Sequence, residues 1–411
     1  MRNRREFIKT VAGATAGALV MGRDLMSAAA QAPGAATAPV SRLGQIQIGG
    51  RRVKVVDIHA HCNIPGTPAL GPRGGGGGAG GGAGAAAGAV GRGRGGAGAA
   101  AGAGGGAGAT AGAGRGGGGA AAGGGGGGAQ ALGPGRIAEM DRRGIDVQVL
   151  SINGYGWYAT QDRDLASRFV AVQDEGLSAW CKQHPDRFVA LTSPAMQFPD
   201  LAAQQLERAM KELGLRGASI GGHVEGESLS SPRFDPFWAK AQELQALIFM
   251  HPGGADNVLK DGAWQGTRGD LGNIIGNPLE STVFTSRLIY DGTLDKFPGL
   301  KICVAHAGGY LPSYLGRAEV ACEVRGNANC ANKKKPSEYL KTQVMIDTMI
   351  FSDEGLRHLV AELGAGQIVY GTDIPFNWPD SVDAIVRANY LNNAQKEAML
   401  GGTLMRLLKI A

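Results

Sequence analysis

The sequence predicts an α/β protein built as a single (β/α)₈ TIM barrel. Eight short apolar stretches recur along the chain, and amphipathic segments lie between them. Apolar strands that alternate with helices are typical of a parallel sheet covered on both faces. Once two unusual segments are set aside, roughly 300 residues remain, enough for one large domain. Eight such units in this length favour a closed barrel over an open sheet.

The elements follow in order along the chain. Strands are expected at 53–59, 147–152, 188–191, 217–220, 246–250, 301–305, 344–347 and 367–370. Helices are expected at 164–183, 200–213, 233–244, 312–325 and 353–363. Asp200 and Pro312 stand near predicted helix starts, where both residue types are favoured. The barrel is therefore expected at 53–411.

Residues 1–30 are expected to be a twin-arginine export signal. Asn3-Arg4-Arg5-Glu6-Phe7-Ile8-Lys9 is followed by an apolar stretch of small residues at 11–20, and Ala28-Ala29-Ala30 offers a cleavage site. This order is that of a bacterial signal peptide, with a disordered basic start as the alternative. The apolar stretch is too short for a stable membrane anchor. We expect a periplasmic or secreted protein, with a linker at 31–52.

A Gly/Ala-rich insert interrupts the barrel at 71–135 and is expected to be disordered. It has almost no side-chain surface to bury and a large backbone entropy to lose. It falls between the first strand and its helix, in a loop at the C-terminal face, where barrels tolerate insertions.

The basic charge of the chain does not indicate a nucleic-acid partner. The formal net charge is +6, of which residues 1–30 carry +3 and the insert carries four arginines, so about −1 remains for the barrel. The five cysteines form no CxxC pair, so a cysteine zinc site is not expected. Cys322 and Cys330 are close enough to form a disulfide, although Cys322 could instead be packed in a helix.

Two histidines end the first predicted strand, in Asp57-Ile58-His59-Ala60-His61. Alternate side chains of a strand share a face, so Asp57, His59 and His61 are expected to point the same way. Two imidazoles at this spacing can reach one metal ion about 2 Å away. The pattern alone is a moderate indication.

Further candidates stand at the ends of other strands. His251 follows the fifth predicted strand, His306 the sixth and Asp373 the eighth. In a parallel barrel these positions meet at one mouth, where barrel enzymes hold their active sites. The arrangement therefore predicts a metal site. His223, after the fourth strand, could line the pocket and is not expected to be a ligand.

From Asp57 to about Leu408 the chain resembles the amidohydrolase superfamily, and within it the aminocarboxymuconate-semialdehyde decarboxylase family. The matching stretches are Asp57-Ile58-His59-Ala60-His61, 136–149, Arg187-Phe188-Val189-Ala190-Leu191, Lys211-Glu212-Leu213-Gly214, His251-Pro252, 297–306 and Gly371-Thr372-Asp373-Ile374-Pro375-Phe376. The resemblance implies one divalent metal, usually zinc with manganese as the alternative, held by His59, His61, His251 and Asp373. It also implies that His306 transfers protons.

The expected groups make chemical sense together. Asp373 would offset the charge of the metal and can accept a proton. A metal lowers the pKa of its bound water from about 15.7 towards 7. Imidazoles exchange protons near neutral pH, which suits His306 to take or return that proton. No lysine ends the fourth strand, where binuclear relatives carry a bridging one, so a single metal is favoured.

Three functions remain open for this centre. A non-oxidative decarboxylase (a lyase) of a small carboxylate substrate is favoured. A hydrolase of an ester, lactone or amide bond is the alternative, and a non-catalytic periplasmic metal-binding protein is the third.

Decarboxylation calls for a cation that holds the substrate carboxylate. Arg317 and Arg325 lie on the helix after His306, and Arg325 is the better candidate by its distance. The resemblance implies a homodimer in which such an arginine reaches the neighbouring subunit's site. The alternative is a surface ion pair with Glu319 or Glu323. The family's other carboxylate-binding arginine belongs to the loop that the Gly/Ala insert replaces here.

Overall fold

The computed structural model describes residues 41–67, 132–152, 154–253 and 269–411. The predicted signal peptide and most of the predicted Gly/Ala insert lie outside the described residues. The described part of the predicted linker contains a short antiparallel hairpin of β1 (Gln47–Ile48) and β2 (Arg51–Arg52). Helix α3 (Pro134–Arg143) begins inside the segment predicted to be disordered up to 135, because a proline favours the first turn of a helix.

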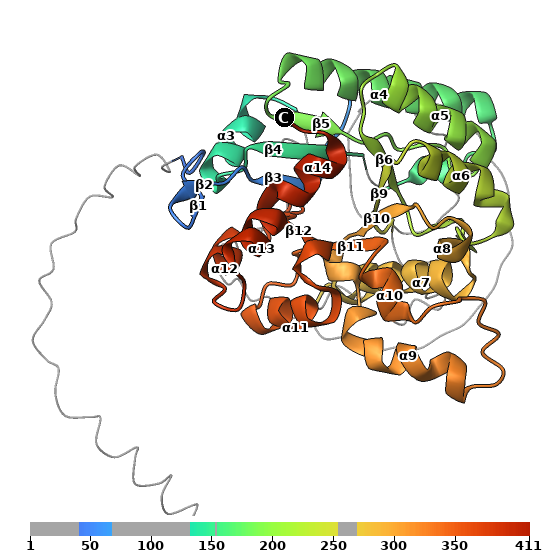
Figure 1. Ribbon diagram of the computed structural model, residues 1–411. Helices are drawn as coiled ribbons and strands as arrows, with labels where there is room; N and C mark the ends of the chain where they lie inside the picture. Colours follow the sequence, from blue (N-terminus) through green and yellow to red (C-terminus); the bar gives the residue numbers. More distant parts are fainter. Residues whose placement is uncertain (1–40, 68–131, 153, 254–268) are drawn as a thin grey trace, which may run out of the picture. The chain divides into compact units, whose positions relative to one another are not determined.

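Eight parallel strands form the barrel (Figure 1). They are β3 (Val56–His61), β4 (Val147–Ser151), β5 (Phe188–Ala190), β6 (Gly217–Ile220), β9 (Leu247–Met250), β10 (Lys301–Val304), β11 (Val344–Asp347) and β12 (Ile368–Val369). Hydrogen bonds order them as β3-β4-β5 and β6-β9-β10-β11-β12. Each overlaps a predicted strand, and β6 and β11 match the predicted limits at both ends, whereas β3 begins three residues later and ends two residues later than predicted.

Two further backbone contacts close the strands into a ring. Thr192, just after β5, pairs with β6, and Ala60 of β3 pairs with Ile374 beyond β12. At this second junction the backbone N–H of Asp373 donates to the carbonyl of His59 at 2.8 Å. The barrel predicted from the sequence is confirmed, and its closing seam runs between the first and the last barrel strand.

Helices surround the strands. The longer ones are α3, α4 (Arg163–Gln183), α5 (Pro199–Lys211), α6 (Asp235–Glu243), α7 (Asn277–Tyr290), α9 (Leu315–Val324) and α11 (Asp353–Leu363). The shorter ones are α8 (Thr293–Lys296), α10 (Pro336–Leu340), α12 (Val382–Arg387), α13 (Asn393–Glu397) and α14 (Thr403–Leu408). Side-chain caps set some starts: Asp162 accepts from Leu165 N before α4, and Ser352 accepts from Gly355 N before α11. The helix predicted at 312–325 is divided, because a 3₁₀ turn precedes α9.

The two largest apolar clusters of the described residues hold the barrel together. The larger joins the outer faces of the strands to helical side chains such as Trp238 of α6. The smaller consists of strand residues such as Phe249 together with Leu404 of α14, and it fills the inside of the barrel. A Cβ at Gly401, just before α14, would come within 2.2 Å of the carbonyl of Lys54, which precedes β3. Helix α14 therefore covers the N-terminal end of the barrel and leaves the opposite mouth for polar residues.

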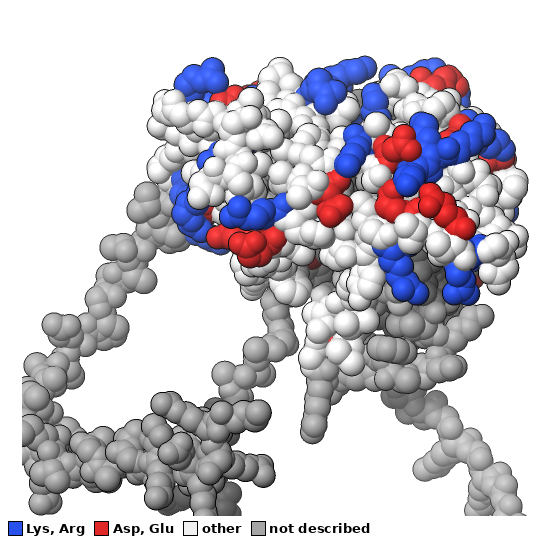
Figure 2. Space-filling view, turned by 60° about the horizontal axis from the view of Figure 1, so that its bottom comes forward, with Lys and Arg blue, Asp and Glu red and all other residues white. Residues whose placement is uncertain are grey.

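Charged side chains of both signs are interspersed on the face shown in Figure 2. Exposed ion pairs of the described residues, such as Arg163 with Asp200, add little to stability. Within the described ranges, no helix combines the length and the apolar character that crossing a membrane requires.

A disulfide joins Cys322, near the end of α9, to Cys330 in the following loop. Of the two alternatives that the sequence left open, pairing is the one found. The bridge spans a sequence separation of eight residues, and Arg325 lies inside the loop that it closes.

Candidate metal centre

Four of the predicted site residues meet at the C-terminal mouth of the barrel. His59 and His61 end β3, His251 follows β9, and Asp373 follows β12. One ligand atom of each lies within 4.8 Å of the others, and all four residues are buried. Three imidazoles and one carboxylate, carried by three strands, thus surround one small volume.

The donor atoms of this cluster converge closely. Nε2 of His59 lies 3.1 Å from Nε2 of His61, and Oδ1 of Asp373 lies 3.1 Å from the first and 3.0 Å from the second. The ring of His251 is centred 4.9 Å from that of His59 and 4.4 Å from that of His61. Nitrogen and carboxylate donors in this number fit a divalent transition metal such as zinc.

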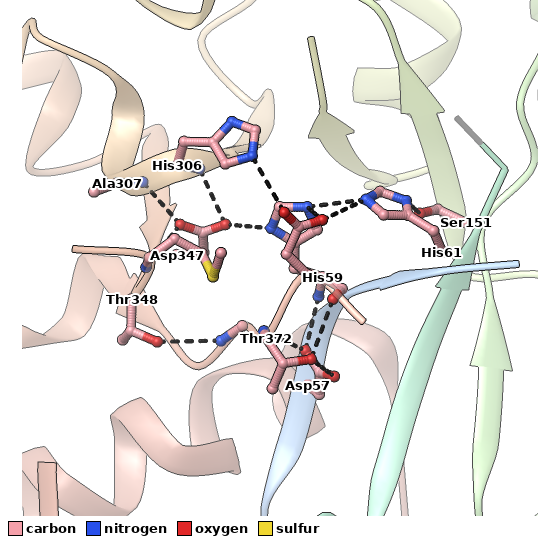
Figure 3. A network of polar contacts seen from close by, with 12 residues as sticks. Asp57, His59, His61, Ser151, His306, Ala307, Asp347, Thr348 and Thr372 are labelled. Atoms are coloured by element: carbon pink, nitrogen blue, oxygen red, sulfur yellow. Dashed lines mark hydrogen bonds and ion pairs between the residues drawn. The ribbon is translucent and has the colours of Figure 1, made fainter. Parts of the chain in front are cut away.

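A carboxylate that the sequence analysis missed orients His59. Nδ1 of His59 lies 2.7 Å from Oδ2 of Asp347, the last residue of β11, and both side chains are fully buried (Figure 3). A histidine that donates Nδ1–H to a carboxylate keeps Nε2 for a metal. The signal that could have revealed Asp347 is its position, an acidic residue at the carboxyl end of a strand.

The charges of the cluster favour a cation. Burial acts to raise the pKa of Asp373, but the neighbouring histidines hold it well below its usual range. Burial lowers the pKa of His61 to about 4 and that of His251 well below its usual range, so both rings are neutral, as metal ligands must be. Burial also acts to lower the pKa of His59, but Asp373 and Asp347 raise it to about 10. These carboxylates therefore attract a positive charge to the position that Nε2 of His59 faces.

His306 lies beside the cluster on the turn after β10. Its Nε2 is 3.8 Å from Oδ2 of Asp373, and its ring is centred 5.2 Å from that of His59. His306 and Ala307 both have a positive φ, 57° and 56°, a backbone conformation that costs residues with side chains about 1–3 kcal/mol. Asp347 accepts hydrogen bonds from both backbone N–H groups, at 3.1 and 2.8 Å, and so holds this turn.

Asp57 does not join the cluster, although we expected it to point the same way as the two histidines. The pairing of β3 with β4 shifts register between Asp57 and Ala60, which interrupts the regular alternation. The carboxylate accepts hydrogen bonds from Oγ1 of Thr372 at 2.7 Å and Nε2 of Gln148 at 3.1 Å. Burial raises the pKa of Asp57 to about 6, although the hydrogen bonds from Thr372 and Gln148 act to lower it. Asp57 therefore ties β3 to β4 and to the segment that carries Asp373.

A second residue missed by the sequence analysis supports the His251 loop. Glu280 of α7 is buried, and its Oε1 accepts hydrogen bonds from the backbone N–H groups of Gly222 at 2.9 Å and Gly253 at 3.1 Å. These glycines lie in the loops after β6 and β9, and Gly253 follows His251 by two residues. Oε2 of Glu280 lies 4.0 Å from Nε2 of His223, so this histidine faces the supporting helix.

The structure does not bring Arg317 or Arg325 to the cluster of the same chain. Arg317 lies in the first turn of α9 and Arg325 directly after the helix, and both are exposed. The expected ion pairs are not formed either: Glu319 accepts a hydrogen bond from the backbone of Ser337, and Glu323 pairs with Lys335.

Comparison with known proteins identifies the family. A family model described as Amidohydrolase matches residues 56–410, which include all eight barrel strands and the whole cluster. The chain belongs to the amidohydrolase family. A relative in Dictyostelium discoideum, 2-amino-3-carboxymuconate-6-semialdehyde decarboxylase, is 33% identical over 282 residues, which cover 66% of this chain and 75% of the relative.

Solved structures of decarboxylases share the fold. The 5-carboxyvanillate decarboxylase of Sphingomonas paucimobilis aligns with a TM-score of 0.64 and 26% identity, over 69% of this chain and 85% of that one. A second structure is that of a dihydroxybenzoic acid decarboxylase of Polaromonas sp. JS666 with bound manganese and the inhibitor 2-nitroresorcinol. It aligns with a TM-score of 0.61 and 28% identity, over 68% of this chain and 86% of that chain. The predicted resemblance is confirmed: this is an enzyme of the amidohydrolase superfamily with a divalent-metal site.

Proposed function

We propose that this protein is a metal-dependent, non-oxidative decarboxylase of a small aromatic carboxylate. The observation that carries the proposal is the position of His306, 3.8 Å from the carboxylate of a four-residue metal cluster. The similar proteins named above are decarboxylases, and two of them are named for aromatic acids.

His59, His61, His251 and Asp373 would hold one divalent ion. When bound, the ion supplies a positive charge that polarises a substrate oxygen and acidifies water. The bond between the ring carbon and the carboxylate breaks, carbon dioxide leaves, and the electron pair stays on the carbon. His306 delivers a proton to that carbon from Nε2 and regains one from solvent. Asp373, buried and 3.8 Å from Nε2 of His306, would hold this ring in place.

We propose zinc as the resident ion and manganese as the alternative. Three nitrogen donors favour zinc, whereas the similar Polaromonas structure contains manganese. Elemental analysis of the purified protein distinguishes the two ions.

We also propose that the chain acts as a homodimer in which Arg325 serves the neighbouring copy. Side chains on and beside α9 are exposed although apolar, with exposed fractions of 66% for Tyr314, 42% for Val320 and 69% for Val324. Burying such a face against a second copy would remove it from water. Arg325 lies in the disulfide loop beside this face and is exposed.

Export by the twin-arginine route is proposed from residues 1–30 alone. A fusion of these residues to a reporter, compared with an Arg4→Lys/Arg5→Lys version, tests it: the reporter should reach the periplasm only with both arginines intact.

Carbon dioxide release tests the main proposal. The metal-loaded protein is incubated with hydroxybenzoates and enal carboxylates, and with esters and lactones in parallel. Release of carbon dioxide that is lost in His306→Gln supports decarboxylation. Hydrolysis without carbon dioxide release would replace the decarboxylase by a hydrolase, and metal binding without turnover would favour a binding protein.

A further inference from the structure

We infer that Asp347 is a positioning residue that couples the metal ligand His59 to the turn carrying His306. The metal-binding half of this inference stands on the geometry alone. The half that concerns His306 rests on the proposed function.

Four hydrogen-bond donors converge on the two carboxylate oxygens of Asp347. Oδ2 accepts hydrogen bonds from Nδ1 of His59 at 2.7 Å and from the backbone N–H of His306 at 3.1 Å. Oδ1 accepts hydrogen bonds from the backbone N–H groups of Ala307 at 2.8 Å and Met349 at 3.2 Å. Figure 3 shows the carboxylate between His59 on one side and the His306 turn on the other. Since a carboxylate accepts at both oxygens and donates at neither, it matches a site lined by donors alone.

The surrounding backbone keeps this carboxylate in place. Gly371, after β12, packs between two strands: a Cβ there would lie 3.0 Å from Cβ of Asp347 and 3.0 Å from Cβ of His59. Thr348, which follows Asp347 in the chain, accepts a hydrogen bond at Oγ1 from the backbone N–H of Gly371 at 3.2 Å. The same Oγ1 forms a hydrogen bond with Oγ of Ser381 at 2.7 Å. Strands β11, β12 and β3 are therefore pressed together at the level of Asp347.

One carboxylate thus controls two features of the centre. It keeps the proton of His59 on Nδ1, so that Nε2 faces the other ligands. It also holds His306 and Ala307 in a backbone conformation that they would not adopt by themselves. A displacement of Asp347 would disturb the metal ligand and the proton donor together.

Asparagine at this position would replace one acceptor by a donor. If its amide nitrogen faces His59, the ring must place its proton on Nε2, the nitrogen that faces the other ligands. If the amide nitrogen faces the other way, the N–H groups of Ala307 and Met349 lose their acceptor. Either orientation leaves one of the two features unsupported.

Manganese titration of the metal-stripped protein tests the first feature. The Kd for Mn²⁺ of Asp347→Asn is expected to rise about 10- to 100-fold over that of the wild type. Asp174→Asn is the matched control, because Asp174 is also buried and accepts from Oγ1 of Thr192 at 2.8 Å, outside the cluster. Its Kd should equal that of the wild type.

Turnover at saturating Mn²⁺ tests the second feature. The kcat of Asp347→Asn is expected to fall about tenfold or more while KM stays within about twofold, because a small misplacement of His306 slows the chemical step. An unchanged Kd overturns the inference, and a raised Kd with unchanged kcat overturns the link to His306. If the wild type shows no decarboxylation, the proposed function fails while the titration still decides the role of Asp347. Should Asp347→Asn not fold, Asp347→Ser is measured by the same criteria.

Discussion

Nε2 of His306 and Oδ2 of Asp373 lie 3.8 Å apart, and both residues have a left-handed backbone, with φ of 57° and 59°. Residues with side chains adopt this conformation only where the surroundings hold them. Here the surroundings are hydrogen bonds to Asp347 on one side and the junction with β3 on the other. Contacts with the rest of the centre therefore hold His306 and Asp373 in this backbone conformation.

Replacing His306 by glutamine should abolish most of the turnover and leave the metal in place. Removal of a proton-transfer residue typically slows a reaction by about 10²- to 10⁴-fold. The measurement is kcat for carbon dioxide release beside metal content by elemental analysis. His358→Gln, on the exposed face of α11, is the control and should behave as the wild type. An unchanged kcat in His306→Gln would exclude the proposed role.

The double substitution His59→Ala/His61→Ala should remove the bound metal. The wild type is expected to hold about one zinc or manganese per chain, since four donors surround one volume. Chelation of the wild type should likewise stop turnover, and added Zn²⁺ or Mn²⁺ should restore it. Equal metal content in the wild type and the variant would overturn the ligand assignment.

Replacing Glu280 by alanine should destabilise the fold by about 2–4 kcal/mol. The backbone N–H groups of Gly222 and Gly253 would lose a buried charged acceptor, and a cavity would remain. Urea unfolding monitored by circular dichroism measures the change. Glu354→Ala, whose side chain is 84% exposed, should leave the unfolding midpoint unchanged, and a similar loss in both variants would contradict the supporting role.

The stability of Asp174→Asn relative to the wild type should depend on pH. Burial raises the pKa of Asp174 to about 7, although the hydrogen bond from Thr192 opposes it. Such a carboxyl binds its proton more tightly when folded, so it stabilises the wild type at low pH, and this contribution is lost as the pH rises through 7. Asparagine does not titrate. From pH 5.5 to pH 8 the variant should therefore gain about 2 kcal/mol over the wild type. A pH-independent difference in the free energy of unfolding would show that Asp174 does not titrate in this range.

Arg325→Ala should lower kcat/KM for carboxylate substrates by about tenfold or more, because a charge-assisted hydrogen bond contributes about 1.5–3 kcal/mol. Arg357→Ala, on the exposed side of α11, is the control. Unchanged turnover in Arg325→Ala would show that this arginine does not hold the substrate.

Val324→Asp should convert a dimer into monomers and should lower turnover as the dimer is lost. Light scattering after size-exclusion chromatography measures the oligomeric state.

Features carried by local sequence could be predicted. The apolar strands are recognisable because each is buried on both faces. The four metal-cluster residues are recognisable because parallel strands end at the same mouth of the barrel. Asp347 was assigned only to a strand, since its contact with His59 joins residues 288 positions apart. Glu280 was missed for the same reason, as its partners lie on the loops of other strands. The role of Asp57 depended on a register shift that no local pattern reveals.

The seam between β3 and β12 has a consequence for how the centre is made. His61 and Asp373 are separated by 312 residues, so a chain leaving the ribosome carries its first ligands long before its last one. The cluster can be complete only when nearly the whole barrel has been synthesised. The complete four-residue site can therefore exist only after β12 has been translated, and an ion held by it would join the beginning of the barrel to its end.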